Sequence, residues 1–250
     1  MEKFIVLAGR RSGTTLLVTC LDSHPQIECS KEVFSTTRRF RYFQIDRRSS
    51  LFYKFRSASM KRKIDYIFRR QQLIDAFLAE VYIPVDNVKA MGSRVSYEQA
   101  RKYPEILEWI IKNEVSVIHL IRENPVKAIV SHFTAKKRQT FHTTSKVERV
   151  TVELSPYNLQ QSVIKRMHET ERYRNMFKNQ RHHEIYYESF IADRDGETRH
   201  ILDFLQVDHF VPLTSNLVKQ NPDSLKDILE NYDEIAQAFK GTVYEKYLVV

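Results

Sequence analysis

A short segment near the N-terminus, GRRSGTT at positions 9–15, has the residue types and spacing of a phosphate-binding turn. An apolar run precedes it and predicts a buried strand, and the residues after it predict a helix. A turn between a strand and a helix gathers backbone N–H groups and the positive helix end at one point, where an anion binds. Gly13 permits close backbone approach, and Thr14 and Thr15 add amide and hydroxyl donors. The segment therefore predicts a phosphate or sulfate site; the alternative is a turn without a ligand.

The same segment differs from the loop of nucleotide kinases and hydrolases. Their pattern GxxxxGK[ST] places a Lys after the second glycine, and this Lys reaches the β and γ phosphates. Here Thr14 stands in place of the Lys, and Ala8 in place of the first Gly. Such enzymes also hold magnesium with an Asp at a strand end, whereas the second buried strand of this chain ends in Arg122. We therefore expect an anion site without a metal and keep a P-loop kinase or hydrolase as the alternative.

Predicted strands and helices alternate along the chain. Apolar runs predict strands at 3–8, 115–121 and 184–187, with a weaker candidate at 85–91. Helical patterns cover 14–22, 97–113, 125–137, 156–179, 196–205 and 222–240. This alternation implies a parallel sheet with helices on both faces and ligands at the carboxyl ends of its strands. We therefore expect an α/β fold, built as a single domain over residues 1–250.

Residues 37–83 are expected to form a basic, aromatic-rich helical insertion in that domain. Lys and Arg dominate 37–72, where Asp46 and Asp65 are the only acidic residues, and Phe and Tyr are interleaved. Farther on, apolar residues recur at helical spacing, which predicts an amphipathic helix with a basic outer face: Ile64, Phe68, Ile74, Phe77 and Val81. Two interpretations stay open: a solvated insertion, or an element that attracts an anionic acceptor, membrane surface or nucleic acid.

The composition agrees with a basic globular protein. The formal net charge is +9, which favours anionic partners without choosing among them. The two cysteines, Cys20 and Cys29, have no His at metal spacing and form no disulfide framework, so a reducing compartment is expected. The apolar run near the N-terminus is far shorter than the roughly 20 residues of a membrane span, and no cleavage site follows it. We therefore expect a cytoplasmic protein.

The stretch RRSGTTLLVTCLDSHPQIECSKEVF resembles the 5′-phosphosulfate loop of sulfotransferases that use 3′-phosphoadenosine-5′-phosphosulfate (PAPS). The tyrosylprotein, trehalose and nodulation-factor types are the most similar. This resemblance implies a P-loop-like sulfotransferase architecture, PAPS as donor, adenosine 3′,5′-bisphosphate (PAP) as product, and no metal. It places the basic residue before SGTT on Arg11, with Arg10 beside it. The loop donors fall on Ser12, Gly13, Thr14 and Thr15.

Three further stretches resemble the same family in the expected order. In IHLIRENPVKAIVSHFTAKK, the resemblance puts the ligands of the cofactor's 3′-phosphate on Arg122 and Ser131, although many members space this pair one residue closer. EIYYESFIADRDGETRHILDFLQV is similar to an architectural segment, so Tyr187 and Glu188 receive no catalytic role. LVKQNPDSLKDILENYDEI resembles a C-terminal loop in which Lys219 would reach a cofactor phosphate. A surface ion pair for Arg122 and a solvated Lys219 remain the alternatives.

The family resemblance also suggests a catalytic base. Transfer of a sulfuryl group needs a side chain that takes the proton of the acceptor hydroxyl. The base of the tyrosylprotein type falls on Glu32, which with Arg11 completes the expected catalytic pair. Histidines are the rivals: His24, which is expected to be structural, and His132 and His142. Lys89 is a candidate for the lining of the acceptor cleft. The expected acceptor is a carbohydrate, glycolipid or other alcohol, and no nucleic acid is expected.

Overall fold

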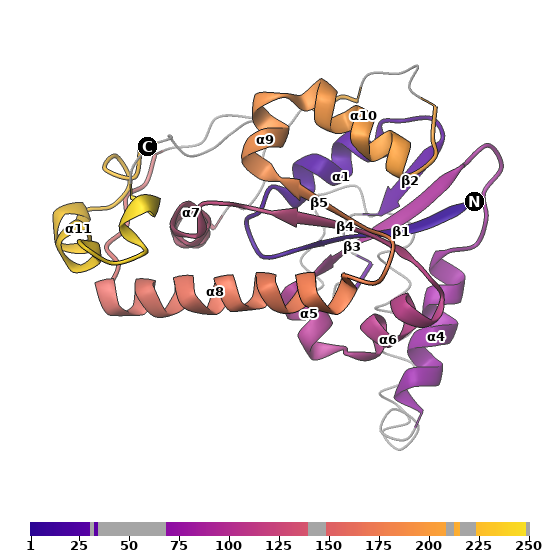
Figure 1. The fold of residues 1–250 in the computed structure, drawn as a ribbon, viewed down its shortest axis with the longest axis horizontal. Coiled ribbons are helices and arrows are strands. Elements are labelled where there is room, and N and C mark those ends of the chain that lie inside the picture. The colour runs from indigo at the N-terminus through magenta and orange to yellow at the C-terminus, as the bar shows by residue number, and fades with distance from the viewer. Residues whose placement is uncertain (31–32, 35–68, 140–148, 209–212, 216–223, 249–250) are drawn as a thin grey trace.

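The computed structural model describes residues 1–30, 33–34, 69–139, 149–208, 213–215 and 224–248. Its centre is a five-stranded sheet in which every pair of neighbouring strands is parallel, in the order β2-β3-β1-β4-β5 (Figure 1). The strands are β1 (Glu2–Ala8), β2 (Ile27–Ser30), β3 (Ala90–Ser96), β4 (Ser116–Ile121) and β5 (His182–Tyr186). The expected α/β fold with a parallel sheet is therefore confirmed.

Helices cover both faces of this sheet (Figure 1). One face carries α1 (Thr14–Asp22), α9 (Tyr187–Ala192) and α10 (Arg194–Phe204). The other carries α4 (Arg70–Val81), α5 (Tyr97–Lys102), α6 (Glu105–Lys112) and α8 (Pro156–Phe177). Successive residues of a strand point to opposite faces, so β1 supplies Phe4 and Val6 to one apolar core and Ile5 and Leu7 to the other. A strand buried on both faces explains the continuous apolar run that marks it in the sequence.

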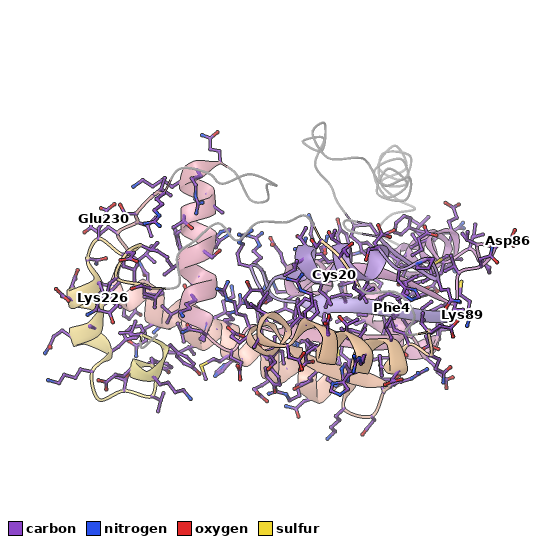
Figure 2. The ribbon with its side chains drawn as sticks, turned by 90° about the horizontal axis from the view of Figure 1, so that it is seen from above. Phe4, Cys20, Asp86, Lys89, Lys226 and Glu230 are labelled. Atoms are coloured by element: carbon purple, nitrogen blue, oxygen red, sulfur yellow. The ribbon has the colours of Figure 1, made fainter. Side chains whose placement is uncertain are left out.

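A third apolar cluster lies beside the sheet. It is formed by α7 (Pro125–Arg138), α11 (Tyr232–Phe239), the 3₁₀ turn η2 (Glu245–Tyr247) and the first part of α8. In Figure 2, Lys226 and Glu230 mark this end of the molecule, and Asp86 and Lys89 mark the opposite end. The molecule is thus a two-faced sheet with a helical end that packs on its own apolar core.

Local sequence explains where the two longest helices begin. The side chain of Asn124 accepts a hydrogen bond from Lys127 N at 2.9 Å, and Pro125 follows it at the first position of α7. Ser155 plays the same part for α8, where Pro156 is the first helical residue. Side-chain oxygens at such caps satisfy backbone N–H groups that have no partner within the helix, and proline lacks this N–H. Both starting points agree with the prediction.

Several predicted boundaries were wrong. The weak strand at 85–91 is instead β3, Ala90–Ser96, and β2 was not predicted. The helix predicted over 97–113 is two helices, because Pro104 has no N–H to continue the first. The helix predicted over 222–240 covers only Tyr232–Phe239 of the described residues.

Only the end of the predicted insertion, residues 37–83, falls within the described chain. There α4 buries Ile74, Phe77 and Val81 in the core, as the helical spacing predicted. Residues 35–68, with most of the basic run, lie outside the described residues. Across the described helices, none combines the length and the apolar character that crossing a bilayer requires.

Candidate functional site

The predicted phosphate-binding turn lies at the carboxyl end of the central strand, between β1 and α1. The chain leaves β1 toward β2 on one side, whereas β4 borders β1 on the other side, so the connections diverge at this point. Ligands of parallel α/β sheets bind at such a switch point. Arg11 and Gly13 have positive φ angles of 59° and 88°, and the first turn of α1 has no acidic residue. The local fold is therefore the strand-turn-helix that the anion prediction required.

Gly13 is constrained from two sides. Its φ of 88° is in the left-handed region that favours glycine. A Cβ atom at this position would also overlap the ring of Tyr187, the first residue of α9. The loop therefore packs directly on an aromatic ring contributed by the chain after β5, which the sequence segment alone did not indicate.

Three residues predicted to bind the donor lie together at this edge of the sheet. Arg11 Nε donates to Ser131 Oγ on α7 at 3.1 Å. Arg122, directly after β4, donates from Nη1 to the carbonyl oxygen of Arg11 at 3.1 Å. The loop, the end of β4 and the middle of α7 thus meet although more than a hundred residues separate the loop from the other two in the chain. The parallel neighbours β1 and β4 explain this, because both strands end at the same edge.

Positive charge is concentrated at this point. The pKa of Arg11 is lowered to about 10, first by burial and then by the charges of Arg122, Arg138 and Arg94. Arg11 still carries its charge at neutral pH, and its neighbours repel it. A bound anion would relieve this repulsion, so the electrostatics favour a ligand with more than one negative charge.

The remaining loop residues face different surroundings. Arg10 is exposed and forms an ion pair with Glu98 on α5. Ser12 and Thr14 are buried, and Thr15 is partly buried in the first turn of α1. The Ser12 hydroxyl accepts a hydrogen bond from Arg166 Nη2 at 2.7 Å. The side chain of Ser12 is therefore bonded to α8. Only the backbone N–H of Ser12 is left to contribute to an anion site.

Arg122 is held by the two residues at the start of α9. Its guanidinium lies 5.0 Å from the centre of the Tyr187 ring, and its Nε lies 3.9 Å from a Glu188 carboxylate oxygen. The same carboxylate accepts the backbone N–H of Glu123 at 3.0 Å and that of Asn124 at 3.5 Å. Both residues thus position the end of β4, in keeping with the architectural role expected for them.

Some of the other predicted residues lie outside the described part of the chain, namely Glu32, His142 and Lys219. His24 is structural as expected, because Nε2 lies 2.9 Å from the Asp208 carbonyl and Nδ1 accepts from Gln26 N at 3.2 Å.

The expectation that Lys89 lines the acceptor cleft is wrong. Lys89 precedes β3 and bonds to Asp208 at 2.8 Å, at the amino edge of the sheet, where its neighbour Ala90 pairs with Glu2. The error follows from the misplaced strand, since a strand that starts at Ala90 carries Lys89 away from the ligand edge.

His132 is the described histidine nearest in sequence to the site. Burial lowers the pKa of its imidazole, and the charges of Arg10 and Arg11 lower it further. The ring is therefore neutral at pH 7, which is the form that accepts a proton. His132 thus stays the rival of Glu32 as the base.

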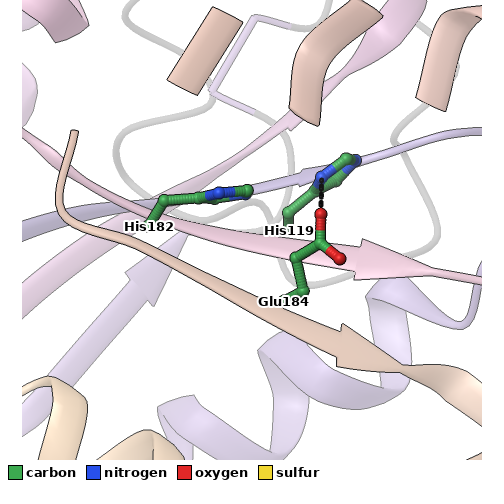
Figure 3. Close-up of side chains that lie close together, drawn as sticks. All are labelled: His119, His182 and Glu184. Carbon is green, nitrogen blue, oxygen red and sulfur yellow. Dashed lines mark ion pairs between the residues drawn. The ribbon is translucent and has the colours of Figure 1, made fainter. Parts of the chain in front are cut away.

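His119, His182 and Glu184 form a separate group on β4 and β5 whose ligand atoms lie within 4.8 Å of one another (Figure 3). These residue types bind metal ions. However, the Glu184 carboxylate accepts hydrogen bonds of 2.6 and 3.0 Å from Arg174 on α8. It also lies 3.7 Å from His119 Nδ1, and His119 Nε2 bonds to Tyr97. A guanidinium on the carboxylate opposes a cation, so we interpret the group as an ion-pair network between α8 and the sheet.

Sequence reasoning missed Arg166 on α8, whose guanidinium lies against the loop. A signal was present, because Arg166 interrupts an apolar series at helical spacing. The series consists of Leu159, Val163, Tyr173 and Phe177, all buried. A charged residue in line with a buried stripe needs a polar partner inside the protein.

Comparison with known proteins gives a family and a fold. Residues 4–211 match the model of a family described as the sulfotransferase family. A sulfotransferase from Alicyclobacillus acidocaldarius is similar in structure, with a TM-score of 0.51, 16% identity, and coverage of 99% of this chain and 94% of that chain. A mouse sulfotransferase solved in complex with PAP has a TM-score of 0.47, 15% identity, and coverage of 83% and 60%. No curated protein sequence matches the chain.

Proposed function

The chain belongs to the sulfotransferase family, and we propose that it transfers a sulfuryl group from PAPS to the hydroxyl of a carbohydrate, glycolipid or other alcohol. One observation carries the choice of donor: Arg11 bonds to Ser131 at 3.1 Å while Arg122 bonds to the Arg11 carbonyl at 3.1 Å. The predicted phosphate-binding turn, Arg122 and Ser131 therefore share one edge of the sheet. A donor with two anionic ends fits this arrangement.

Each end of the donor has suitable partners in this proposal. The turn at positions 9–15, with the N-terminus of α1 and Arg11, would hold the 5′-phosphosulfate end. Arg122 and Ser131 would hold the 3′-phosphate, since an arginine fork and a hydroxyl are strong donors to phosphate oxygens. Lys219 stays a candidate for a further phosphate contact.

In the proposed reaction the acceptor oxygen bonds to sulfur while the bond from sulfur to the phosphate oxygen breaks in line with it. Arg11 stabilises the charge that builds on the leaving phosphate. The acceptor proton passes to a base, for which Glu32 is the first candidate and His132 the second. Positioning and charge stabilisation would supply most of the rate, as in phosphoryl transfer.

Ligand-induced thermal stabilisation tests this proposal. We expect PAP at about 100 times its dissociation constant to add about 2.7 kcal/mol, which raises Tm by roughly 5 to 10 °C in a chain of this size. The rise should persist with EDTA, because Arg122 stands at the strand end where a magnesium-dependent enzyme has an Asp. A rise with magnesium-ATP alone would indicate a kinase or hydrolase, and a rise with an oligonucleotide alone would indicate a nucleic-acid-binding module.

Turnover with a panel of hydroxyl acceptors then tests the base. Glu32→Gln should abolish conversion of PAPS to PAP and leave the thermal shift with PAP intact. Glu108→Gln is the control, since Glu108 is exposed on α6. Full activity of Glu32→Gln would contradict Glu32 as the base and leave His132 as the candidate.

A further inference from the structure

Arg166 on α8 contacts the predicted anion-binding turn from the face of the sheet opposite α1 (Figure 1). Its Nη1 donates to the carbonyl oxygen of Arg10 at 2.7 Å, and its Nη2 donates to Ser12 Oγ at 2.7 Å. The fit is close, because a Cβ atom on Gly9 would lie 3.2 Å from the guanidinium. Burial lowers the pKa of Arg166 to about 10, so the group stays charged at neutral pH. A partly buried guanidinium is therefore bound to the turn on both sides of Arg11, at the Arg10 carbonyl and the Ser12 hydroxyl.

These contacts determine which way the peptide groups of the turn face. In a trans peptide the carbonyl of one residue and the N–H of the next point in opposite directions, and no described peptide bond is cis. Arg166 binds the carbonyl of Arg10, so the N–H of Arg11 points away from α8. Arg122 binds the carbonyl of Arg11 in the same way, which sets the direction of the Ser12 N–H. Two arginines thus orient two successive amides of the turn.

The helix that carries Arg166 is itself attached to the first residue of α5 and to β5. Thr170 Oγ1 accepts from the Tyr97 hydroxyl at 3.5 Å, and the Tyr173 hydroxyl donates to the Tyr97 carbonyl at 3.2 Å. Arg174, which follows Tyr173 in the chain, binds Glu184 on β5. Three contacts within the two turns of α8 that follow Arg166 therefore fix its position along the sheet.

We propose that Arg166 is a positioning residue that orients the loop amides toward the 5′-anionic end of the donor. This proposal rests on the proposed function, because it assumes that the turn binds that end. It makes Arg166 act through the Arg10 carbonyl and the Ser12 hydroxyl, without touching the reacting atoms.

Binding of three probes tests this role by calorimetry: PAP, adenosine 5′-monophosphate and adenosine 3′-monophosphate. Arg166→Gln should weaken PAP and the 5′-monophosphate about 10- to 100-fold, because two hydrogen bonds from a charged donor are lost. The 3′-monophosphate should change by less than about 2-fold, because Arg122 and Ser131 remain. Arg166→Lys keeps the charge but not the fork, so its loss should be intermediate. If Arg166→Gln does not fold, Arg166→Lys provides the same test.

Arg172→Gln is the matched control, since Arg172 is an exposed arginine on the same helix. It should bind all three probes like the wild type. Unchanged binding in Arg166→Gln would overturn the proposal, and so would an equal loss for the 5′- and 3′-monophosphates, which would indicate general structural damage. A wild-type chain that binds none of the probes would overturn the proposed function, and this inference with it.

Discussion

Gly13 meets a conformational and a steric requirement at the same position. Its φ is 88°, and its α-carbon faces the ring of Tyr187, which also lies 5.0 Å from the Arg122 guanidinium. One aromatic ring therefore contacts both parts of the proposed donor site. The glycine permits this contact, and any side chain there would separate the loop from α9.

We predict that Gly13→Ala is more destabilising than an alanine at a glycine of similar conformation. Gly241 has a φ of 72° with nothing within 4 Å of its Cβ position, so Gly241→Ala should cost only the backbone strain, about 1 to 2 kcal/mol. Gly13→Ala should cost about 2 to 4 kcal/mol, because the overlap with Tyr187 adds to that strain. Urea unfolding of the two variants measures the difference. An equal decrease in the free energy of unfolding in both variants would show that the Tyr187 ring moves aside at no energetic cost.

The helix α8 and the strands β4 and β5 are joined by the network around Glu184. Contact with His119 first, and the pair with Arg174 after it, hold the pKa of Glu184 well below its usual range, against the effect of burial. This network lies on the same helix as Arg166, so the contacts that stabilise the fold also hold the loop in place.

We predict that Glu184→Gln lowers the free energy of unfolding by about 1 to 3 kcal/mol at pH 7. The exposed Glu171 pairs with the same arginine, and Glu171→Gln should change stability by less than about 0.5 kcal/mol. Because the folded pKa of Glu184 lies below the unfolded value of about 4.3, its contribution is fully present above that pH and is lost as pH falls toward the folded pKa. Urea unfolding at pH 7 and pH 3.5 should therefore show a smaller effect at the lower pH. An effect of the same size at both would contradict the ion-pair interpretation.

The helical end of the molecule is attached through α7 to the edge of the sheet where β1 and β4 end. Asn124, which caps α7, donates from Nδ2 to the carbonyl of Tyr247 at 2.8 Å. The apolar cluster below it joins α7, α8 and α11. The helix with Ser131 is thus held between the sheet and the C-terminal segment.

We predict that this cluster contributes to the stability of the whole chain. Ile235 on α11 is fully buried, so Ile235→Ala should cost about 2 to 5 kcal/mol. Ile83 is 57% exposed, and Ile83→Ala should stay within about 0.5 kcal/mol of the wild type. Thermal unfolding followed by circular dichroism checks both. A second, earlier transition in Ile235→Ala would show that the helical end unfolds separately from the sheet.

Much of the fold was predictable because its signals are local. The apolar runs of β1 and β4 are continuous since both faces of these strands are buried, and Asn124-Pro125 and Ser155-Pro156 mark helix starts by capping chemistry. The short β2 and the shifted β3 were missed. The four residues of β2 carry little periodic signal, and Gly92, Ser93 and Arg94 interrupt the apolar run of β3. Pairing with neighbouring strands therefore decides where both strands begin and end.

The sequence by itself also predicts the chemistry of the turn at 9–15. The order of strand, glycine-bearing turn and helix predicts an anion site, and Thr14 in place of the lysine of nucleotide kinases disfavours a nucleoside triphosphate. Only the tertiary structure decided which distant residues surround this turn. Arg166, Tyr187 and Arg94 come from three different elements, and sheet order brings them to one edge. Local patterns cannot report such contacts, because they depend on how strands far apart in the chain pair with one another.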